Sequence, residues 1–159
     1  MSDRKTEVLD TIEAGRQKLN AVLGQLQADD WEKPIQDADQ QWTVRQIVAH
    51  LVDAQKGMAG QITKINAGTE AIPPDFDLNR WNKRTVEKSA DKTRQELLAA
   101  LSEGHSAVKQ VIESLSENDF QKQGRHSSLR IMTLEEFGKE IGKHEMEHAQ
   151  IIADKLGLK

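Results

Sequence analysis

The sequence contains no cysteine and only three prolines among its 159 residues. Without cysteine the chain has no disulfide, no thiolate metal ligand and no cysteine nucleophile. Any bound metal ion must therefore be held by nitrogen and oxygen atoms. The scarcity of proline leaves long stretches of the chain free to form helices, because proline disrupts a helix interior.

The sequence also lacks a surplus of positive charge and any long apolar run. Its formal net charge is -4, with lysine and arginine interleaved among aspartate and glutamate. This pattern offers no basic surface to nucleic acid or to anionic lipid. The N-terminal segment is polar and has no apolar region of the kind that marks a signal peptide, and no stretch is long enough to span a membrane. We expect a cytoplasmic protein that binds a small-molecule substrate, with neither nucleic acid nor membrane as a partner.

The length and the spacing of apolar residues predict one all-α domain over residues 1–159. Apolar residues recur three and four positions apart, which is typical of helices that bury one face. We identify no strand. The predicted long helices cover approximately residues 5–27, 43–66, 90–116 and 133–156, and Gly157 marks the end of the last one.

Two of these helices begin with the same local pattern, the capping box. Thr43 is followed three residues later by Gln46, and Thr133 by Glu136. In each pair the threonine side chain accepts a hydrogen bond from a backbone N–H that the helix leaves unpaired, and the longer side chain accepts one in return. We expect Thr43 and Thr133 to be the N-caps.

A long connection separates the second and third long helices. It contains Pro73 and Pro74 and then a segment, residues 77–88, that is predicted to form a short helix. Structureless connections of this length are uncommon in compact domains, so we interpret it as a crossover that also contributes to the site. A crossover lets the third long helix run parallel to the second, which predicts a four-helix bundle with up-down-down-up topology.

The segment His144-Glu145-Met146-Glu147-His148 contains two histidines four residues apart on the predicted apolar face of the last helix. Residues at this spacing are neighbours, so both imidazoles can bind one metal ion. The segment also has the H-E-x-x-H pattern of metalloproteases, which need a further ligand downstream. Only eleven residues follow His148, and none of them is histidine or glutamate. The third ligand must come from upstream.

His50 is the upstream candidate, since it lies about 10 Å into its helix while His148 lies about 12 Å from the end of the last one. These depths match if the two helices are antiparallel. His105 is too deep in the third long helix, at about 20 Å, and His126 falls in a loop that we expect at the opposite end. We interpret both as structural or exposed. The alternative for each of the three site histidines is a hydrogen-bonded imidazole that fills space in the core.

Three histidines leave coordination positions open, which is typical of a catalytic metal. Glu145 follows a ligand directly, like the general base of metalloproteases, and is the candidate catalytic residue. The competing interpretation, slightly favoured, is a solvated carboxylate paired with Lys139 or Lys143.

Trp42, Trp81 and Asn82 are candidates for the wall of a pocket near the metal, because the predicted topology brings their segments to the mouth of the site. The alternative is that the tryptophans only cover the end of the bundle.

The segment 42–51, from Trp42 through Thr43 to His50 and Leu51, resembles the start of the second helix in the DinB-like family of bacterial four-helix-bundle metalloproteins. His144 and His148 are similar to the histidine pair of that family's last helix. The resemblance implies that His50, His144 and His148 bind one divalent ion, zinc or nickel, in an up-down-down-up bundle that frequently dimerises.

The resemblance also carries expectations about function, because DinB-like relatives include bacillithiol and mycothiol S-transferases and a mycothiol-dependent maleylpyruvate isomerase. The segment 75–82 is similar to the crossover of those proteins. The resemblance to the family implies a metal-dependent enzyme that transfers a low-molecular-weight thiol to an electrophilic small molecule. The alternatives are a hydrolase that uses metal-bound water, with Glu145 as base, and a non-catalytic bundle that binds a small ligand.

Overall fold

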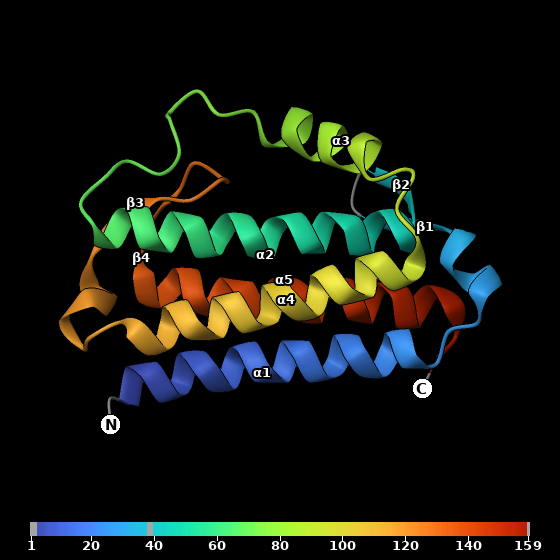
Figure 1. The fold of residues 1–159 in the computed structure, drawn as a ribbon, viewed down its shortest axis with the longest axis horizontal. Helices are drawn as coiled ribbons and strands as arrows, with labels where there is room; N and C mark the ends of the chain where they lie inside the picture. Colours follow the sequence, from blue (N-terminus) through green and yellow to red (C-terminus); the bar gives the residue numbers. More distant parts are fainter. Residues whose placement is uncertain (1–2, 38–39, 159) are drawn as a thin grey trace.

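A computed structural model describes residues 3–37 and 40–158 of the chain. Within these residues four long helices form the body of the molecule: α1 (Asp3–Gly24), α2 (Val44–Asn66), α4 (Arg94–Ser114) and α5 (Leu134–Leu156). A shorter helix, α3 (Leu78–Lys88), lies on the outside of α2 (Figure 1). Figure 1 shows α1 and α5 running in one direction and α2 and α4 in the other, which confirms the predicted four-helix bundle and its up-down-down-up topology.

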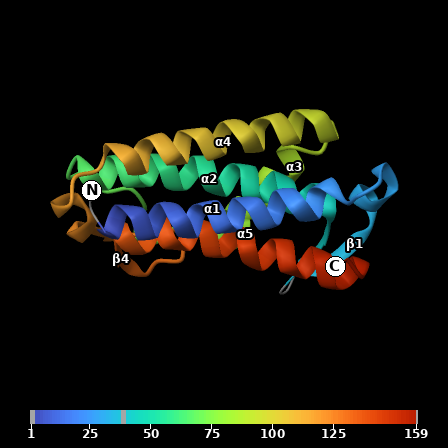
Figure 2. The same cartoon turned by 90° about the horizontal axis from the view of Figure 1, so that it is seen from below.

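Helix pairing follows from this topology. α1 packs mainly against α5 and α2 mainly against α4, so both closest pairs are parallel (Figures 1 and 2). α2 meets α5 in the antiparallel orientation that the histidine depths required.

The apolar core is divided into two clusters at the two ends of the bundle. One cluster includes Leu19, Trp31, Ile47, Leu51 and Ile152, and the other includes Val8, Ile62, Ile112, Phe137 and Ile141.

Glycines allow α1 and α5 to approach very closely. A Cβ atom added to Gly142 would overlap the backbone carbonyl of Thr11, and one added to Gly15 would overlap the carbonyl oxygen of Gly142. At Gly138 an added Cβ would overlap the side chain of Val8. The backbones of the two helices therefore occupy the space that side chains would need. This close approach fixes the position of α5 against α1.

The expectation that the chain has no strand was wrong. Within the described residues, β1 (Pro34–Asp37) pairs with β2 (Gln40–Thr43), and β3 (Gln123–Arg125) pairs with β4 (Ile131–Thr133), both antiparallel. Each strand has only three or four residues. Such strands are too short to display the alternation by which a strand is recognised. β2 and β4 end at Thr43 and Thr133, so each pair leads directly into α2 or α5.

The helix starts at Thr43 and Thr133 are confirmed. Both threonines are N-caps in complete capping boxes with Gln46 and Glu136. A third capping box, Thr93 with Glu96, begins α4 a few residues later than predicted.

The C-terminal ends of α1, α4 and α5 agree with the predicted ends only in part. α1 ends at Gly24, earlier than expected, and a short 3-10 helix, η1 (Ala28–Glu32), buries Trp31 after it. A second 3-10 helix, η2 (Asn118–Gln121), follows α4. Gly157 has a left-handed backbone with φ of 66° and ends α5 as expected.

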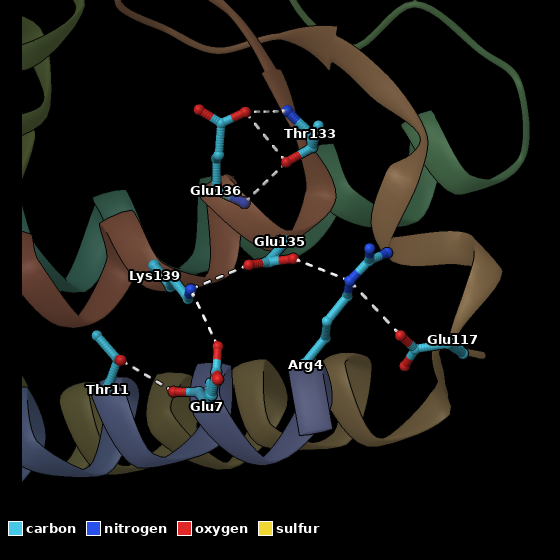
Figure 3. Close-up of polar contacts among 8 residues, drawn as sticks. All are labelled: Arg4, Glu7, Thr11, Glu117, Thr133, Glu135, Glu136 and Lys139. Atoms are coloured by element: carbon cyan, nitrogen blue, oxygen red, sulfur yellow. Dashed lines mark hydrogen bonds and ion pairs between the residues drawn. The ribbon is translucent and has the colours of Figure 1, made fainter. Parts of the chain in front are cut away.

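Ion pairs join the start of α1 to the start of α5 (Figure 3). Lys139 lies 2.9 Å from Glu135 and 3.4 Å from Glu7, and Arg4 lies 3.4 Å from Glu135. Partly exposed pairs of this kind each contribute little to stability.

Among residues 3–37 and 40–158, no helix combines the length and the apolar character needed to cross a membrane.

The close contact of α1 and α5 predicts that Gly142→Ala destabilises the protein by about 1–3 kcal/mol, because the added methyl group meets backbone atoms that cannot rotate away. Gly60→Ala is the matched control, since an added Cβ meets nothing within 4 Å in the exposed middle of α2. It should stabilise by about 0.5–1 kcal/mol. Urea unfolding monitored by circular dichroism measures both changes, and equal stability of the two variants would contradict this packing.

Candidate metal centre

Three imidazoles meet where α2 contacts α5. His50 lies in the second turn of α2, and His144 and His148 lie one turn apart in α5. The Nε2 atom of His144 is 3.1 Å from Nε2 of His50 and 3.0 Å from Nε2 of His148. One ring nitrogen from each histidine falls within 4.8 Å of the others. The structure thus brings together all three histidines that the sequence predicted as ligands.

The donor set of this cluster fits a divalent cation. One proton on the His144 nitrogen can serve only one of its two close nitrogen neighbours, whereas a cation can accept a lone pair from all three rings. Four nitrogens around zinc lie about 3.3 Å apart in tetrahedral geometry, close to the spacing found here. Burial, reinforced by His148, His50 and His126, holds the pKa of His144 well below its usual range. A lowered pKa favours the neutral ring, which is the form that binds metal.

A pocket of about 580 Å³ opens from this cluster, with His50 and His144 in its wall. Its size is that of a typical small-ligand site. Its lining is mainly apolar and comes from α2, α3, α5, the crossover and the β3–β4 loop. Other residues in the wall include Asp53, Met58, Ile72, Phe76, Trp81, Asn82 and Ser128.

The predicted pocket residues have different positions in this arrangement. Trp81 and Asn82 line the pocket from α3. The indole N–H of Trp81 donates to Asp53 at 2.8 Å, which ties α3 to α2, and the ring of Phe76 lies 5.8 Å from that of Trp81. Trp42 instead packs its ring against His50, with centroids 5.2 Å apart. Trp42 therefore contacts the three-histidine cluster, and Trp81 and Asn82 line the pocket beside it.

Polar contacts fix the far wall of the pocket. Arg125 in β3 donates to Glu70 at 3.1 Å and to the carbonyl of Ile72 at 3.2 Å, both in the crossover. Lys122 donates to the side chain and carbonyl of Asn66 at the end of α2. The crossover and the β3–β4 pair are thus joined to each other and to α2.

The expected position of His126, in a loop at the opposite end of the bundle from the site, was wrong. His126 lies on the connection between β3 and β4, but that connection turns back along the bundle, so His126 lines the same pocket as His50 and His144. Burial, and then the charge of Arg130, lowers its pKa. Both His126 and His105 are buried, and neither belongs to the three-histidine cluster within the described residues.

The interpretation of Glu145 as a solvated carboxylate was wrong, because its side chain is only 1% exposed. Oε2 of Glu145 lies 2.7 Å from Nε2 of His105, and the amide of Gln55 donates to the same oxygen. An added Cβ at Gly104 would lie 3.0 Å from Gln55 Oε1, so the missing side chain there leaves room for the amide. These polar groups lie between the two apolar clusters in the middle of the bundle.

A second glutamate, Glu140, was missed in the sequence. It precedes His144 by one helical turn and lines the pocket. Burial, reinforced by the charge of Glu147, raises its pKa, against a smaller opposing effect of Lys143 and Arg130. The spacing of Glu140, His144 and His148, four residues at each step, was a usable signal that the H-E-x-x-H pattern obscured.

The family of the chain follows from a comparison with known proteins, in which the family model of the DinB superfamily matches residues 11–152. The chain belongs to the DinB superfamily. The matched range includes all three histidines of the cluster and both glutamates described above.

The chain is also similar to individual known proteins in sequence and in structure. YfiT from Bacillus subtilis (strain 168), provisionally assigned as a metal-dependent hydrolase, is 29% identical over 135 residues, covering 84% of this chain and 71% of YfiT. The structure of YfiT, described as a four-helix bundle of unusual topology, matches 100% of this chain and 91% of that one, with a TM-score of 0.75 and 24% identity.

Two further solved structures share the fold at lower identity. The mycothiol-dependent maleylpyruvate isomerase has a TM-score of 0.79 and 12% identity, over 93% of this chain and 60% of the isomerase. The colibactin self-resistance protein ClbS, crystallised with double-stranded DNA, has a TM-score of 0.80 and 16% identity, over 98% of this chain and 96% of ClbS. At these identities the similarity establishes the fold alone.

The buried position of Glu145 predicts that Glu145→Ala destabilises the protein by about 3 kcal/mol, because His105 and Gln55 lose their shared buried partner. Glu147→Ala removes an exposed carboxylate two residues further along the same helix and should change stability by less than about 0.5 kcal/mol. Thermal unfolding of the metal-free variants compares them. A Glu145→Ala variant as stable as the parent would show that the buried network contributes nothing.

Proposed function

We propose that this protein is a metal-dependent enzyme that transfers a low-molecular-weight thiol to an electrophilic small molecule, with one divalent ion, zinc or nickel, bound by His50, His144 and His148. The observation that carries the proposal is the convergence of three imidazole nitrogens at the wall of a pocket of about 580 Å³. Membership of the DinB superfamily and the similarity to YfiT, whose assigned activity depends on metal, support it.

The chain's own residues would bind and orient the reactants in this pocket. A divalent ion held by three histidines supplies a Lewis acid that lowers the pKa of a thiol or water in contact with it. Apolar side chains of the wall, such as Met58, Ile72 and Phe76, exclude water from the reacting groups. Trp81, which is held by Asp53, and Asn82 limit the shape of the electrophile that can enter.

Two features favour a thiol as the nucleophile. The chain has no cysteine, so a sulfur nucleophile has to arrive with a cosubstrate. The pocket is much larger than a water molecule needs, and polar groups such as Lys56, Lys64 and Ser128 in its wall suit a thiol that carries polar substituents. Such thiols are abundant and reduced in the cytoplasm, where we expect the protein to act.

Hydrolysis is the second candidate. It is favoured by the provisional assignment of YfiT, which is 29% identical to this chain. Water would then be the nucleophile at the same three histidines, and the pocket would hold only the substrate. The remaining alternative is a bundle that binds a small ligand without catalysis.

The expected partners are a small-molecule substrate and a second copy of the chain. The second copy is expected because the resemblance to DinB-like proteins implies a homodimer. ClbS was crystallised with DNA, but this chain has a formal net charge of -4. Because DNA-binding surfaces depend on clustered positive charge, we do not extend DNA binding to it.

The metal site predicts that the protein, purified without a nickel column, contains about one equivalent of a divalent metal and that His144→Ala reduces its affinity by at least roughly a hundredfold. His126→Gln is the control, because it changes a pocket histidine outside the cluster. Elemental analysis and competition with a chelator measure both. Equal metal affinity in His144→Ala and the parent would contradict the site.

The transferase proposal predicts thiol-dependent turnover. With the zinc-loaded protein, mycothiol or bacillithiol should be consumed in the presence of monochlorobimane, and the rate should fall by roughly a hundredfold or more in His144→Ala. Fluorescence of the thioether product measures the reaction. Hydrolysis of activated esters without any thiol-dependent reaction would instead favour the second candidate.

A further inference from the structure

α5 carries two glutamates close to the histidine pair, and they face different surroundings. Glu145 is the glutamate of the H-E-x-x-H pattern, but its carboxylate is buried against His105 of α4 and Gln55 of α2. Glu145 is absent from the wall of the pocket, whereas Glu140 lines the pocket together with His144. Position on the helix explains the difference, because adjacent residues point about 100° apart while residues four apart share a face.

Glu140 is directed towards the same space as the histidines. Side chains on a helix lean towards its N-terminus, so the His144 ring covers the turn from which Glu140 projects. Residues at this spacing have Cβ atoms about 5–6 Å apart. A molecule that occupies the pocket can therefore contact both the cluster and the Glu140 side chain.

The carboxylate of Glu140 is available for such a contact. Within residues 3–37 and 40–158, no hydrogen bond or ion pair engages its side chain, although the half-buried position makes its charge costly. The charged groups near it are Glu147 and Lys143 on α5 and Arg130 on the β3–β4 loop, and Asp53, Lys56 and Lys64 of α2 face the same pocket. The pKa of Glu140 is raised, so it is a stronger base than an exposed glutamate.

We propose that Glu140, and not Glu145, accepts the proton of the nucleophile that reacts at the three-histidine cluster. This inference rests on the metal site proposed above and applies to either nucleophile. The O–H bond of water or the S–H bond of a thiol breaks, and the proton moves to a carboxylate oxygen of Glu140. The electron pair stays on oxygen or sulfur and forms the bond to the electrophilic carbon. The leaving group departs with its own electron pair, and Glu140 returns the proton to it.

The test uses two small probes that bind zinc but differ in the proton they bring. Acetohydroxamic acid releases a proton as it binds, whereas acetate has none to release. In the zinc-loaded protein, Glu140→Gln should weaken binding of acetohydroxamic acid by roughly tenfold or more, the loss expected for one charge-assisted hydrogen bond. Binding of acetate should be unchanged or tighter, because a negative charge has been removed. Calorimetry with both probes measures this selectivity without any substrate.

Glu145→Gln and Glu147→Gln are the matched controls on the same helix, and Glu147→Gln covers the case in which Glu145→Gln disturbs the buried network. Glu145→Gln should bind the two probes as the parent does. Glu147→Gln should show at most a small part of the loss seen in Glu140→Gln, because it removes only a charge that reinforces the raised pKa of Glu140. Equal affinity of Glu140→Gln and the parent for acetohydroxamic acid, or a selective loss in Glu145→Gln, would overturn the assignment of Glu140. No preference of the parent for acetohydroxamic acid over acetate would also overturn it. Absence of zinc from the parent protein would overturn the proposed metal site together with the assignment of Glu140. If the parent contains zinc and the probe results fail, only the assignment of Glu140 is overturned.

Discussion

The antiparallel contact between α2 and α5 is the constraint on which the site depends. It places His50 level with His144 and His148, although about ninety residues separate them along the chain. The contact exists because the crossover lets α4 run parallel to α2, which returns α5 in the opposite direction to α2. The close glycine packing of α5 on α1 holds α5 from its other side. The histidine cluster is therefore a product of the bundle's topology and of two helix contacts.

The same helix, α5, contributes polar groups to two separate environments. His144 and His148 face α2 near the pocket, and Glu145 is turned into the core towards His105 and Gln55. The buried group lies between the two apolar clusters, where its hydrogen bonds favour one alignment of α2, α4 and α5. A fixed alignment of α2 and α5 also fixes the distances within the histidine cluster. The H-E-x-x-H pattern thus combines the two histidines of the proposed metal site with one glutamate that is buried in the core.

Local patterns predicted the features that depend on neighbouring residues. Capping boxes located Thr43 and Thr133, and matched helix depths identified His50 as the partner of the histidine pair. The failures involved distant contacts. Nothing near Glu145 indicates that His105, forty residues earlier, is its partner, and nothing near His126 indicates that a short strand pair directs it back to the pocket. The strands were not predicted because three or four residues carry too little periodicity. Glu140 was missed because the H-E-x-x-H pattern points to Glu145 instead.

The proposed metal site has His50, His144 and His148 holding one divalent ion at the wall of the pocket. Anomalous diffraction at the zinc edge, from crystals grown with one equivalent of zinc, tests it directly. We expect one strong peak about 2.0–2.1 Å from an imidazole nitrogen of each of the three histidines, with at least one coordination position facing the pocket. Zinc bound elsewhere, or a cluster in which the three rings contact only one another, would contradict this metal site.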